Sequence, residues 1–308
     1  MWLCPGQGAQ QVGMGKDVAA RFPEAAAALH AIDDALDMPL SRLMFDGPEA
    51  DLTETHNAQP AILAHSAAVL AVVRDRAGTA VAAAGHSLGE YSAYVAAGAI
   101  DAPAAAKLVR RRGELMHQAG TERPGTMAAV LGLATAEVEA ACHEGSQQGS
   151  VVVAANLNTP DQTVISGDPA AVDRAGAACK ARGAKRVVPL KVSGAFHSPL
   201  MAPATAKLQL ALDHAPWRDP AFPVIATATA EPVTDAARAR RLLADQLTAP
   251  VRWVDCMQRA ASLAGAGARF VEIGPGSVLA GLLRRIVPGA NVTSLGTADD
   301  VSKFLEAA

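Results

Sequence analysis

A serine between two glycines, in the pentapeptide Gly-His-Ser-Leu-Gly at 85–89, is the feature of this sequence best suited to chemistry. Small and β-branched residues over 79–84 predict a buried strand before it, and the run 88–97 predicts a helix closed by Gly98. Gly-x-Ser-x-Gly between a strand and a helix is typical of a nucleophile elbow, in which Ser87 adopts a strained conformation that exposes its hydroxyl. The alternative is a tight turn with an incidental serine.

The predicted helix after this serine also favours a site for negative charge. Its first N–H groups lack partners within the helix, and the positive end of the helix dipole points at the same turn. The N–H of Leu88 is the first candidate donor, and Gln7 in the loop Pro-Gly-Gln-Gly-Ala-Gln at 5–10 could supply a second. That loop lacks the third glycine of a dinucleotide fingerprint and the lysine of a P-loop, which disfavours phosphate binding.

One predicted helix, over 103–118, carries an arginine among its apolar residues. The apolar stripe of this helix consists of Leu108, Val109, Leu115 and Met116. Arg112 falls in the middle of that stripe, where a guanidinium is costly unless it meets an anion. Either an internal Asp or Glu pairs with it, or it grips a substrate carboxylate through two parallel hydrogen bonds. The residues alone leave both alternatives open.

A serine nucleophile needs a base, and His197 has the most constrained local setting among the histidines. It directly precedes Ser198 and Pro199, which are typical of a helix N-cap and a first helical position. The positive end of that helix disfavours imidazolium, so we expect a neutral ring that can accept a proton. A histidine in a loop is often structural, and the residues alone leave both roles open.

The order of the predicted elements indicates an α/β protein in two parts. Segments 1–124 and 195–308 alternate helices with short strands, which favours a large α/β-hydrolase-like subdomain with a parallel sheet. Segment 125–194 between them has the order β-α-β-β-α-β, which is the ferredoxin-like arrangement. We therefore expect a small ferredoxin-like subdomain inserted into a catalytic one.

Composition excludes several classes of function. The net charge of -3 and the 4% aromatic content give no support for a nucleic-acid surface. No stretch is long and apolar enough to span a bilayer, and no signal peptide is evident. The cysteines lack Cys-x-x-Cys spacing, which favours reduced thiols in a cytoplasmic protein without a zinc site. They are Cys4, Cys142, Cys179 and Cys256.

Five motifs occur along the chain in a defined order. They are the loop at 5–10, Gly-His-Ser-Leu-Gly-Glu-Tyr at 85–91, Arg-Arg-Gly at 111–113, Gly-Ala-Phe-His-Ser at 194–198 and Glu-Ile-Gly-Pro-Gly at 272–276. Together they closely resemble the malonyl-CoA:acyl carrier protein transacylases, the acyltransferases of fatty acid and polyketide synthesis. The resemblance covers essentially the whole chain, and five ordered motifs are far more specific than any one of them.

The resemblance implies a role for each matching residue. Ser87 matches the nucleophile of the family, His197 its general base, and Arg112 the arginine that binds the malonyl carboxylate. Gln7 and Leu88 match the backbone donors of the oxyanion hole.

Three further positions are expected to belong to the site. Gln246, in Gln-Leu-x-x-Pro-Val, matches the residue whose backbone carbonyl orients the histidine. Asn158 matches a cleft residue of the inserted part. Phe196 is expected to crowd the α-carbon of the acyl group and to favour malonyl over methylmalonyl, with ordinary core packing as the alternative.

The implied reaction is a double displacement. Ser87 attacks the malonyl thioester, coenzyme A leaves, and the phosphopantetheine thiol of a carrier protein then takes the malonyl group from the serine ester. This chemistry needs no metal or redox cofactor. The implied partners are malonyl-CoA and an acidic acyl carrier protein, and we expect a monomer. Candidate carrier contacts, which could equally be solvated charges, are Lys180, Arg182, Lys185, Arg186, Arg284 and Arg285.

Three other functions are weighed against this one. A serine esterase or thioesterase of the α/β-hydrolase type predicts a histidine near the end of the chain and a carboxylate partner, and it leaves Arg112 unexplained. A transferase for another acyl-CoA would keep the same chemistry. A non-catalytic carrier-docking protein would be expected to lack Ser87, Arg112 or His197.

Overall fold

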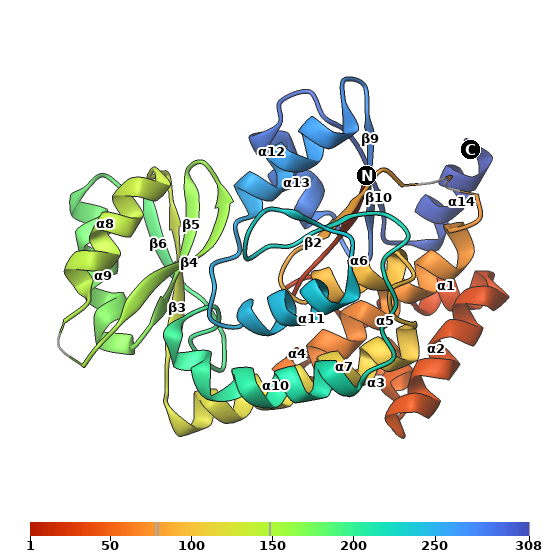
Figure 1. Cartoon of the computed structure of the whole chain (residues 1–308), viewed down its shortest axis with the longest axis horizontal. Coiled ribbons are helices and arrows are strands. Elements are labelled where there is room, and N and C mark those ends of the chain that lie inside the picture. Colours follow the sequence, from red (N-terminus) through yellow and green to blue (C-terminus); the bar gives the residue numbers. More distant parts are fainter. Residues whose placement is uncertain (77, 79, 148, 308) are drawn as a thin grey trace.

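The computed structural model, which describes residues 1–76, 78, 80–147 and 149–307, contains two separate β-sheets (Figure 1). The larger sheet has six strands in the order β10-β9-β1-β2-β7-β8. Its strands are β1 (Trp2–Cys4), β2 (Ala83–Gly85), β7 (Val224–Ile225), β8 (Pro232–Val233), β9 (Arg269–Ile273) and β10 (Asn291–Leu295). All neighbours pair in parallel except β8, which runs antiparallel to β7 at one edge. The predicted α/β class with a parallel sheet is confirmed.

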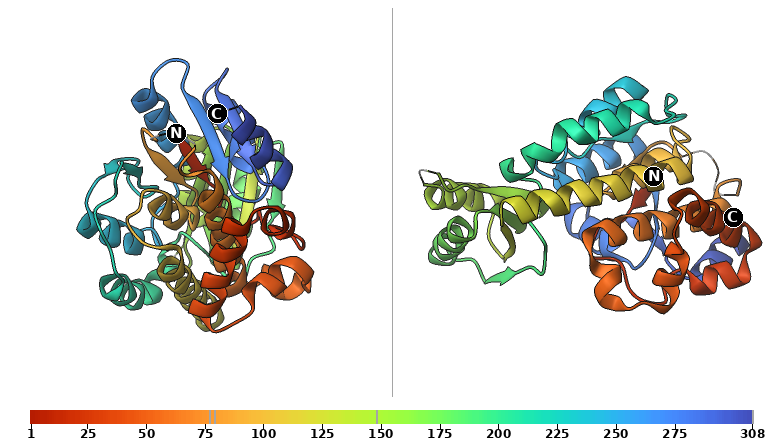
Figure 2. Two further views of the ribbon diagram at one scale, coloured as in Figure 1. Left: turned by 90° about the vertical axis from the view of Figure 1, so that its right-hand side faces the viewer. Right: turned by 90° about the horizontal axis from the view of Figure 1, so that it is seen from below.

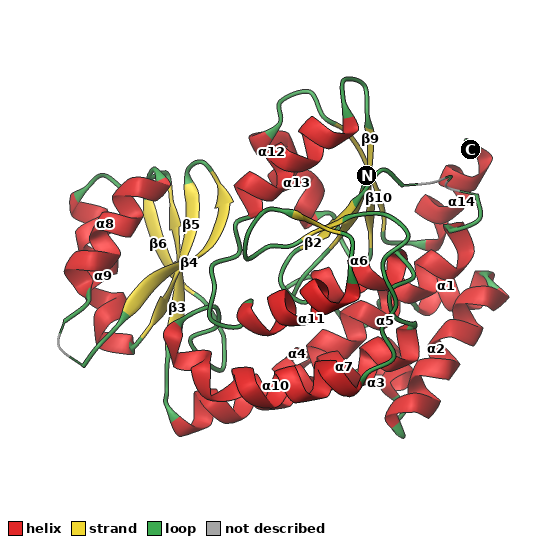
Figure 3. Ribbon diagram, in the orientation of Figure 1, coloured by secondary structure: helices red, strands yellow, loops and turns green. Residues whose placement is uncertain are grey.

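The smaller sheet has four strands in the order β4-β5-β3-β6, and every pair is antiparallel. Its strands are β3 (Thr126–Leu131), β4 (Val152–Thr159), β5 (Gln162–Gly167) and β6 (Arg186–Pro189). Helices α8 (Thr135–Gly145) and α9 (Pro169–Ala181) lie together beside this sheet (Figure 3). Between sheet and helices lies a separate apolar core that includes Val130, Ile165 and Val172.

The remaining helices surround the larger sheet. They are α1 (Lys16–Arg21), α2 (Pro23–Leu36), α3 (Leu40–Asp46), α4 (Glu49–Thr53), α5 (Thr55–Val73), α6 (Gly89–Ala96), α7 (Ala102–Glu122), α10 (Ala202–His214), α11 (Ala236–Asp245), α12 (Trp253–Ala264), α13 (Val278–Ile286) and α14 (Ala298–Glu306). A short 3₁₀ helix, Pro199–Met201, precedes α10.

Alternating side chains place the larger sheet between two apolar layers. Trp2 and Cys4 of β1 belong to the core that contains α5 and α6, whereas Leu3 belongs to the core that contains α12 and α13. Both faces of a parallel sheet must be covered, because its strands are apolar on both sides. Helix α5 is itself buried on almost every side, which fits its nearly continuous run of apolar and small residues.

The two sheets are connected by more than the chain itself. Helix α7 runs from the larger part toward the smaller sheet, where β3 follows it after a short connection (Figure 2). On the return, α10 lies alongside α7. Two backbone hydrogen bonds join β4 to Val251: Val251 N donates to Ala155 O at 2.8 Å, and Leu157 N donates to Val251 O at 2.9 Å. The segment after α11 is thereby fixed to the smaller sheet.

The elements around the serine differ in length from the predicted ones. The predicted strand over 79–84 includes residue 79, which lies outside the described residues, and β2 itself covers only Ala83–Gly85. It is short because its parallel partner β1 offers three residues for pairing. Helix α7 extends beyond the predicted 103–118 at both ends, and the carboxylate of Asp101 caps it by accepting from Ala104 N at 2.7 Å.

Two further findings concern the whole described chain. All four cysteines are buried, and none forms a disulfide in this structure. Within the ranges given above, no helix is both long enough and apolar enough to cross a membrane.

The closeness of β2 and α6 predicts a large effect of one added methyl group. A Cβ at Gly85 would lie 2.0 Å from the backbone carbonyl of Gly89, and backbone cannot move away as a flexible side chain can. We expect Gly85→Ala to destabilise the protein by at least about 3 kcal/mol, measured by urea denaturation. Gly281→Ala is the matched control, since a Cβ there meets nothing within 4 Å. The free energy of unfolding of this variant should be about 0.5–1 kcal/mol higher than that of the wild type. Equal unfolding midpoints for the two variants would contradict the tight elbow.

Candidate active site

Ser87 lies at the turn between β2 and α6 with a backbone φ of 53°, in the left-handed region that non-glycine residues rarely adopt. The glycines on both sides let the backbone close around it. A Cβ at Gly89 would lie 2.1 Å from Cys4 O, so α6 starts in direct contact with the end of β1. The predicted strand–turn–helix geometry is therefore present, with the strain held by the surrounding backbone.

The serine hydroxyl is within hydrogen-bond distance of a histidine that lies 110 residues further along the chain. The distance from Ser87 Oγ to His197 Nε2 is 2.7 Å, and His197 Nδ1 lies 2.9 Å from the backbone carbonyl of Gln246. Because a carbonyl can only accept, Nδ1 carries the hydrogen and Nε2 presents its lone pair to the hydroxyl. The imidazole is thus oriented by a carbonyl where serine hydrolases use a carboxylate.

His197 is buried, and its environment keeps it neutral. Burial lowers its pKa to about 3, with the positive charge of Arg112 as the second cause. The sequence predicts a neutral ring from the positive end of the following helix, and Ser198 does cap the 3₁₀ helix by accepting from Leu200 N at 3.3 Å. Burial and the guanidinium are nevertheless the main causes of the lowered pKa.

Arg112 is buried, and its guanidinium reaches the serine itself. One terminal nitrogen donates to Gln59 Oε1 at 2.8 Å. The other donates to Gln246 Oε1 at 2.9 Å and to Ser87 Oγ at 3.0 Å. No Asp or Glu among the described residues forms an ion pair with Arg112. The first of the two alternatives that the sequence left open, an internal salt bridge, is therefore absent from the described chain. The side chain is held by neutral amides.

The backbone around the serine offers two donors for a developing oxyanion. Within the described chain, neither the N–H of Gln7 nor that of Leu88 donates to another protein group. Leu88 is the residue immediately before α6, and Gln7 lines the same cavity as Ser87. The Gln7 side chain is fixed separately, because its Nε2 donates to Thr55 Oγ1 at 3.3 Å.

Ser87 and His197 open into a cavity of about 500 Å³ between the two sheets. Its wall on the side of the larger sheet includes Gln7, His86, Ser87, Met116 and His197. The opposite wall includes Met127, Asn156, Leu190, Lys191 and Val192. The cavity is therefore lined by both parts of the chain, and it is large enough for an extended acyl thioester.

Phe196 and Asn158 occupy different places near this cavity. Phe196 lines it directly, beside His197. Asn158, on β4, accepts from His86 Nε2 at 2.9 Å and so links the smaller sheet to the elbow. Asn156, two residues earlier on the same strand, is the asparagine that forms part of the cavity wall.

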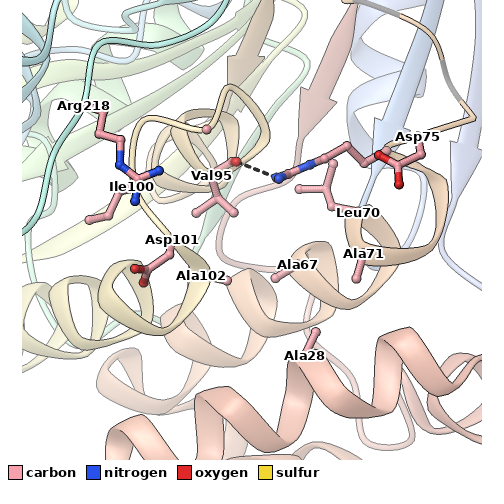
Figure 4. Close-up of a pocket in the computed structure, with 12 residues that line it drawn as sticks. Ala28, Ala67, Leu70, Ala71, Asp75, Val95, Ile100, Asp101, Ala102 and Arg218 are labelled. Atoms are coloured by element: carbon pink, nitrogen blue, oxygen red, sulfur yellow. Dashed lines mark hydrogen bonds between the residues drawn. The ribbon is translucent and has the colours of Figure 1, made fainter.

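A second cavity, of about 360 Å³, lies elsewhere in the protein and is lined in part by α5 and α6 (Figure 4). Apolar residues such as Ala67 and Ile100 line it, and Arg74, which also lines it, donates to Val95 O at 2.8 Å. None of the site residues predicted from the sequence lines it. Of these two cavities, the one at Ser87 combines a nucleophile with a base.

The six predicted carrier contacts are surface residues, and none of them lines the cavity at Ser87. Arg182 is paired with Glu137 and Glu144, and Arg285 with Asp161. The other four, for which the described chain has no ion pair, are Lys180, Lys185, Arg186 and Arg284.

Several residues of the site escape sequence reasoning. Gln59 holds one side of Arg112, Glu90 accepts from the Gln246 side chain, and the exposed Lys191 lines the cavity. Glu90 has the clearest sequence signal, since it is the one acidic residue in α6. Gln59 and Lys191 left none, because their roles arise from neighbours distant in the chain. The described residues hold no group of three or more His, Cys, Asp or Glu placed to bind a metal.

The parallel sheet, the elbow and the cavity together define an α/β enzyme. Comparison with known families gives a match to the acyl transferase domain over residues 1–307. The chain belongs to this family of acyltransferases, which confirms the prediction from the five motifs.

Its relatives carry a common name. The malonyl CoA-acyl carrier protein transacylase of Bacillus subtilis (strain 168) is 42% identical over 285 residues, 92% of this chain and 89% of that protein. The transacylase of the same name from Escherichia coli (strain K12) is 42% identical over 307 residues, 99% of this chain and 98% of that protein.

Solved structures that superpose on this chain are also named as malonyltransferases. A malonyl-transacylase in complex with its holo acyl carrier protein from a type II polyketide synthase superposes with a TM-score of 0.95 at 40% identity, covering 100% of this chain and 99% of that one. An acyl carrier protein S-malonyltransferase from Vibrio cholerae gives a TM-score of 0.93 at 39% identity, covering 98% of each chain.

The neutral imidazole predicts how the reactivity of the serine depends on pH. Since the pKa of His197 is lowered from about 6.5 to about 3, the ring stays in its base form as the pH falls through 6.5. We expect the rate of Ser87 acylation by an activated ester to stay nearly constant from pH 8 to below pH 6. In the Arg112→Met variant, the fall of the acylation rate at acidic pH should begin at a higher pH, because no guanidinium then lowers the pKa of His197. A wild-type rate already halved at pH 6.5 would contradict this assignment.

Proposed function

We propose that this protein transfers a malonyl group from malonyl-CoA to the phosphopantetheine thiol of an acyl carrier protein, in fatty acid or polyketide synthesis. One observation carries the proposal: a buried guanidinium, which has no ion-pair partner among the described residues, donates to the oxygen of the candidate nucleophile itself. A bound acyl group whose carbonyl lies at Ser87 is therefore expected to have a carboxylate only one carbon further on. Malonyl has this length, and the names of the relatives support the same substrate.

In the first half-reaction His197 acts as general base. Its Nε2 takes the proton of Ser87, whose oxygen attacks the thioester carbonyl of malonyl-CoA while Arg112 holds the malonyl carboxylate. The N–H groups of Gln7 and Leu88 stabilise the oxyanion, and losing one such donor would raise the barrier by roughly 3 kcal/mol. Collapse of the tetrahedral intermediate breaks the carbon–sulfur bond, and His197 returns its proton to the leaving thiolate of coenzyme A.

In the second half-reaction the acceptor thiol follows the same path in reverse. His197 takes the proton of the phosphopantetheine thiol, the sulfur attacks the malonyl-serine ester, and Ser87 leaves with the proton. The Gln246 carbonyl keeps the imidazole in the same tautomer in both halves. No metal or redox group enters either step.

The two parts of the chain have separate tasks in this proposal. Segments 1–124 and 195–308 form an α/β-hydrolase-like subdomain that carries the chemistry. Segment 125–194 forms a ferredoxin-like subdomain, supported by the strand order β4-β5-β3-β6, that supplies the opposite wall of the cavity. Phe196 bounds the acyl pocket and favours malonyl over methylmalonyl, and Asn158 holds His86 at the junction between the two parts.

Basic residues are proposed to receive the phosphates of both substrates and the acidic carrier. Lys191 is exposed on the cavity wall, where a pantetheine arm leaving Ser87 has to pass. Coenzyme A and the carrier prosthetic group both continue this arm into a phosphate. The exposed Lys180, Lys185, Arg186 and Arg284, and the partly paired Arg182 and Arg285, are proposed to meet the carrier surface. A monomeric state and a cytoplasmic location stay predictions from the sequence.

Hydrolase activity and transfer of other acyl groups are the competing functions. A simple esterase has no use for Arg112 beside its nucleophile, and an acyl-CoA without a carboxylate would leave that guanidinium without a direct ion-pair partner. The proposed function accounts for both the residue and its burial.

Intact-mass measurement tests the function directly. Incubation with malonyl-CoA should add one malonyl group to the protein, and Ser87→Ala should remain unmodified. Addition of holo carrier protein should remove the group and produce malonyl-carrier, whereas apo carrier, which lacks the phosphopantetheine thiol, should not. Release of free malonate to water at the same rate with either carrier form would instead identify a hydrolase.

The role of Lys191 is tested by removing the phosphate from the substrate. Lys191→Gln should raise KM roughly tenfold for malonyl-CoA, because a charge-assisted contact is lost, and should leave KM for malonyl-pantetheine nearly unchanged. Lys303→Gln, which changes an exposed lysine on the distant α14, should leave both values unchanged. Equal changes of KM for the two thioesters in Lys191→Gln would exclude a phosphate contact.

A further inference from the structure

The side-chain amide of Gln246 lies between two buried groups that can carry opposite charge. On one side Gln246 Oε1 accepts from Arg112, at 2.9 Å. On the other side Gln246 Nε2 donates to the carboxyl oxygen Oε2 of Glu90, at 2.7 Å. Glu90, Arg112 and Gln246 are all buried. The carboxyl and the guanidinium are thus joined through a single amide, without touching each other.

The neighbours of this amide allow only one orientation. Besides Glu90, the oxygens around Nε2 are Ser87 O and Thr227 Oγ1, both at 3.1 Å. A flipped amide would place its NH₂ group against the guanidinium and its oxygen against these acceptors. The dipole of the amide therefore points its negative end at Arg112 and its positive end at Glu90.

Several hydrogen-bond donors stabilise the carboxylate form of Glu90, although burial, the largest cause, raises the pKa of this group overall. Its Oε2 accepts from Thr227 N at 2.9 Å and from Thr227 Oγ1 at 2.7 Å, in addition to Gln246 Nε2. Burial raises the pKa of Glu90, whereas these donors and the charge of Arg112 lower it. Oε1 has no hydrogen-bond partner in the described chain, and Oε2 is already surrounded by donors. The first turn of α6 also favours a negative charge.

Arg112 keeps part of its hydrogen-bonding capacity free. A guanidinium has five N–H donors, and the bonds to Gln59, Gln246 and Ser87 use three of them. Its Nε has no partner in the described chain. A direct ion pair would neutralise the charge and occupy the donors that a substrate carboxylate needs.

We propose that Glu90 is the counter-charge of Arg112, held one amide away by Gln246, and that this spacing makes the site selective for acyl groups bearing a carboxylate. The inference rests on the proposed function of Arg112 as the malonyl-carboxylate ligand. Glu90 compensates the buried guanidinium while the cavity is empty, and the intervening amide keeps the guanidinium available. Glu90 thus acts as a counter-charge and the Gln246 side chain as a positioning residue, separate from the Gln246 carbonyl that orients His197.

Thermal melting with two thioesters tests this role without turnover. In a Ser87→Ala background, malonyl-CoA should raise Tm more than acetyl-CoA, which lacks only the carboxylate. Adding Glu90→Gln removes the charge and keeps an acceptor oxygen for Thr227 and Gln246. We call the difference between the Tm shifts with malonyl-CoA and with acetyl-CoA the excess shift. This excess shift with malonyl-CoA should be larger in the Glu90→Gln variant, because the substrate carboxylate now supplies the missing negative charge. A lower Tm without ligand but an unchanged excess shift would show that Glu90 is merely structural and would overturn the proposal.

A second pair of variants keeps the test informative if Glu90→Gln fails to fold. Gln246→Glu retains the backbone carbonyl and brings a carboxylate directly onto Arg112, so the excess shift with malonyl-CoA should fall at least severalfold. Gln246→Met, which is neutral, should retain most of that excess. Equal losses in the two variants would overturn the proposal. No excess shift in the Ser87→Ala parent would instead refute the malonyl-binding role of Arg112, and this inference with it.

Discussion

A guanidinium buried against neutral amides is the interaction on which the rest of this site depends. Desolvating an arginine costs several kcal/mol unless an anion compensates it. Here Gln59 and Gln246 supply only dipoles, and the described chain provides no direct ion pair. The charge of Arg112 therefore remains effective inside the cavity, where it lowers the pKa of His197 and donates to Ser87. In the proposed reaction, a substrate carboxylate completes this electrostatic arrangement.

Backbone geometry brings the reacting groups together. Both Ser87 and His197 have positive φ values, of 53° and 56°, and such strain persists only where the surrounding structure enforces it. At the serine, the close approach of Gly85 and Gly89 to neighbouring backbone provides that enforcement. At the histidine, the hydrogen bond to the Gln246 carbonyl fixes the ring. The apolar packing on both faces of the parallel sheet stabilises the folded protein and offsets the conformational strain of these two residues.

The smaller sheet also contributes to the order of the site. Its strand β4 bonds to Val251, five residues after Gln246, and Asn158 on the same strand accepts from His86, next to Ser87. The cavity wall opposite the serine is thus attached at two points to the segments that carry the base and the nucleophile. This attachment explains how residues from both parts of the chain can form a single site.

The sequence determined the local features that depend on a few adjacent residues. Gly-x-Ser-x-Gly predicts the elbow because a turn without Cβ atoms is a local property, and the helical wheel places Arg112 on the buried face for the same reason. Ser198 and Pro199 likewise predict the start of the helix after His197. The order of strands and helices indicated an α/β protein with an inserted antiparallel part, and five motifs in order indicated the family.

Only the tertiary structure decided what those residues meet. The alternatives for Arg112, an internal acid or a substrate carboxylate, could not be separated by spacing, because its partners Gln59 and Gln246 come from two other segments of the chain. The same holds for Glu90, which reaches Arg112 only through Gln246, and for Lys191, whose place on the cavity wall depends on how the smaller sheet packs. Local chemistry is encoded in neighbouring residues, whereas burial and electrostatic pairing arise only when distant segments are brought into contact.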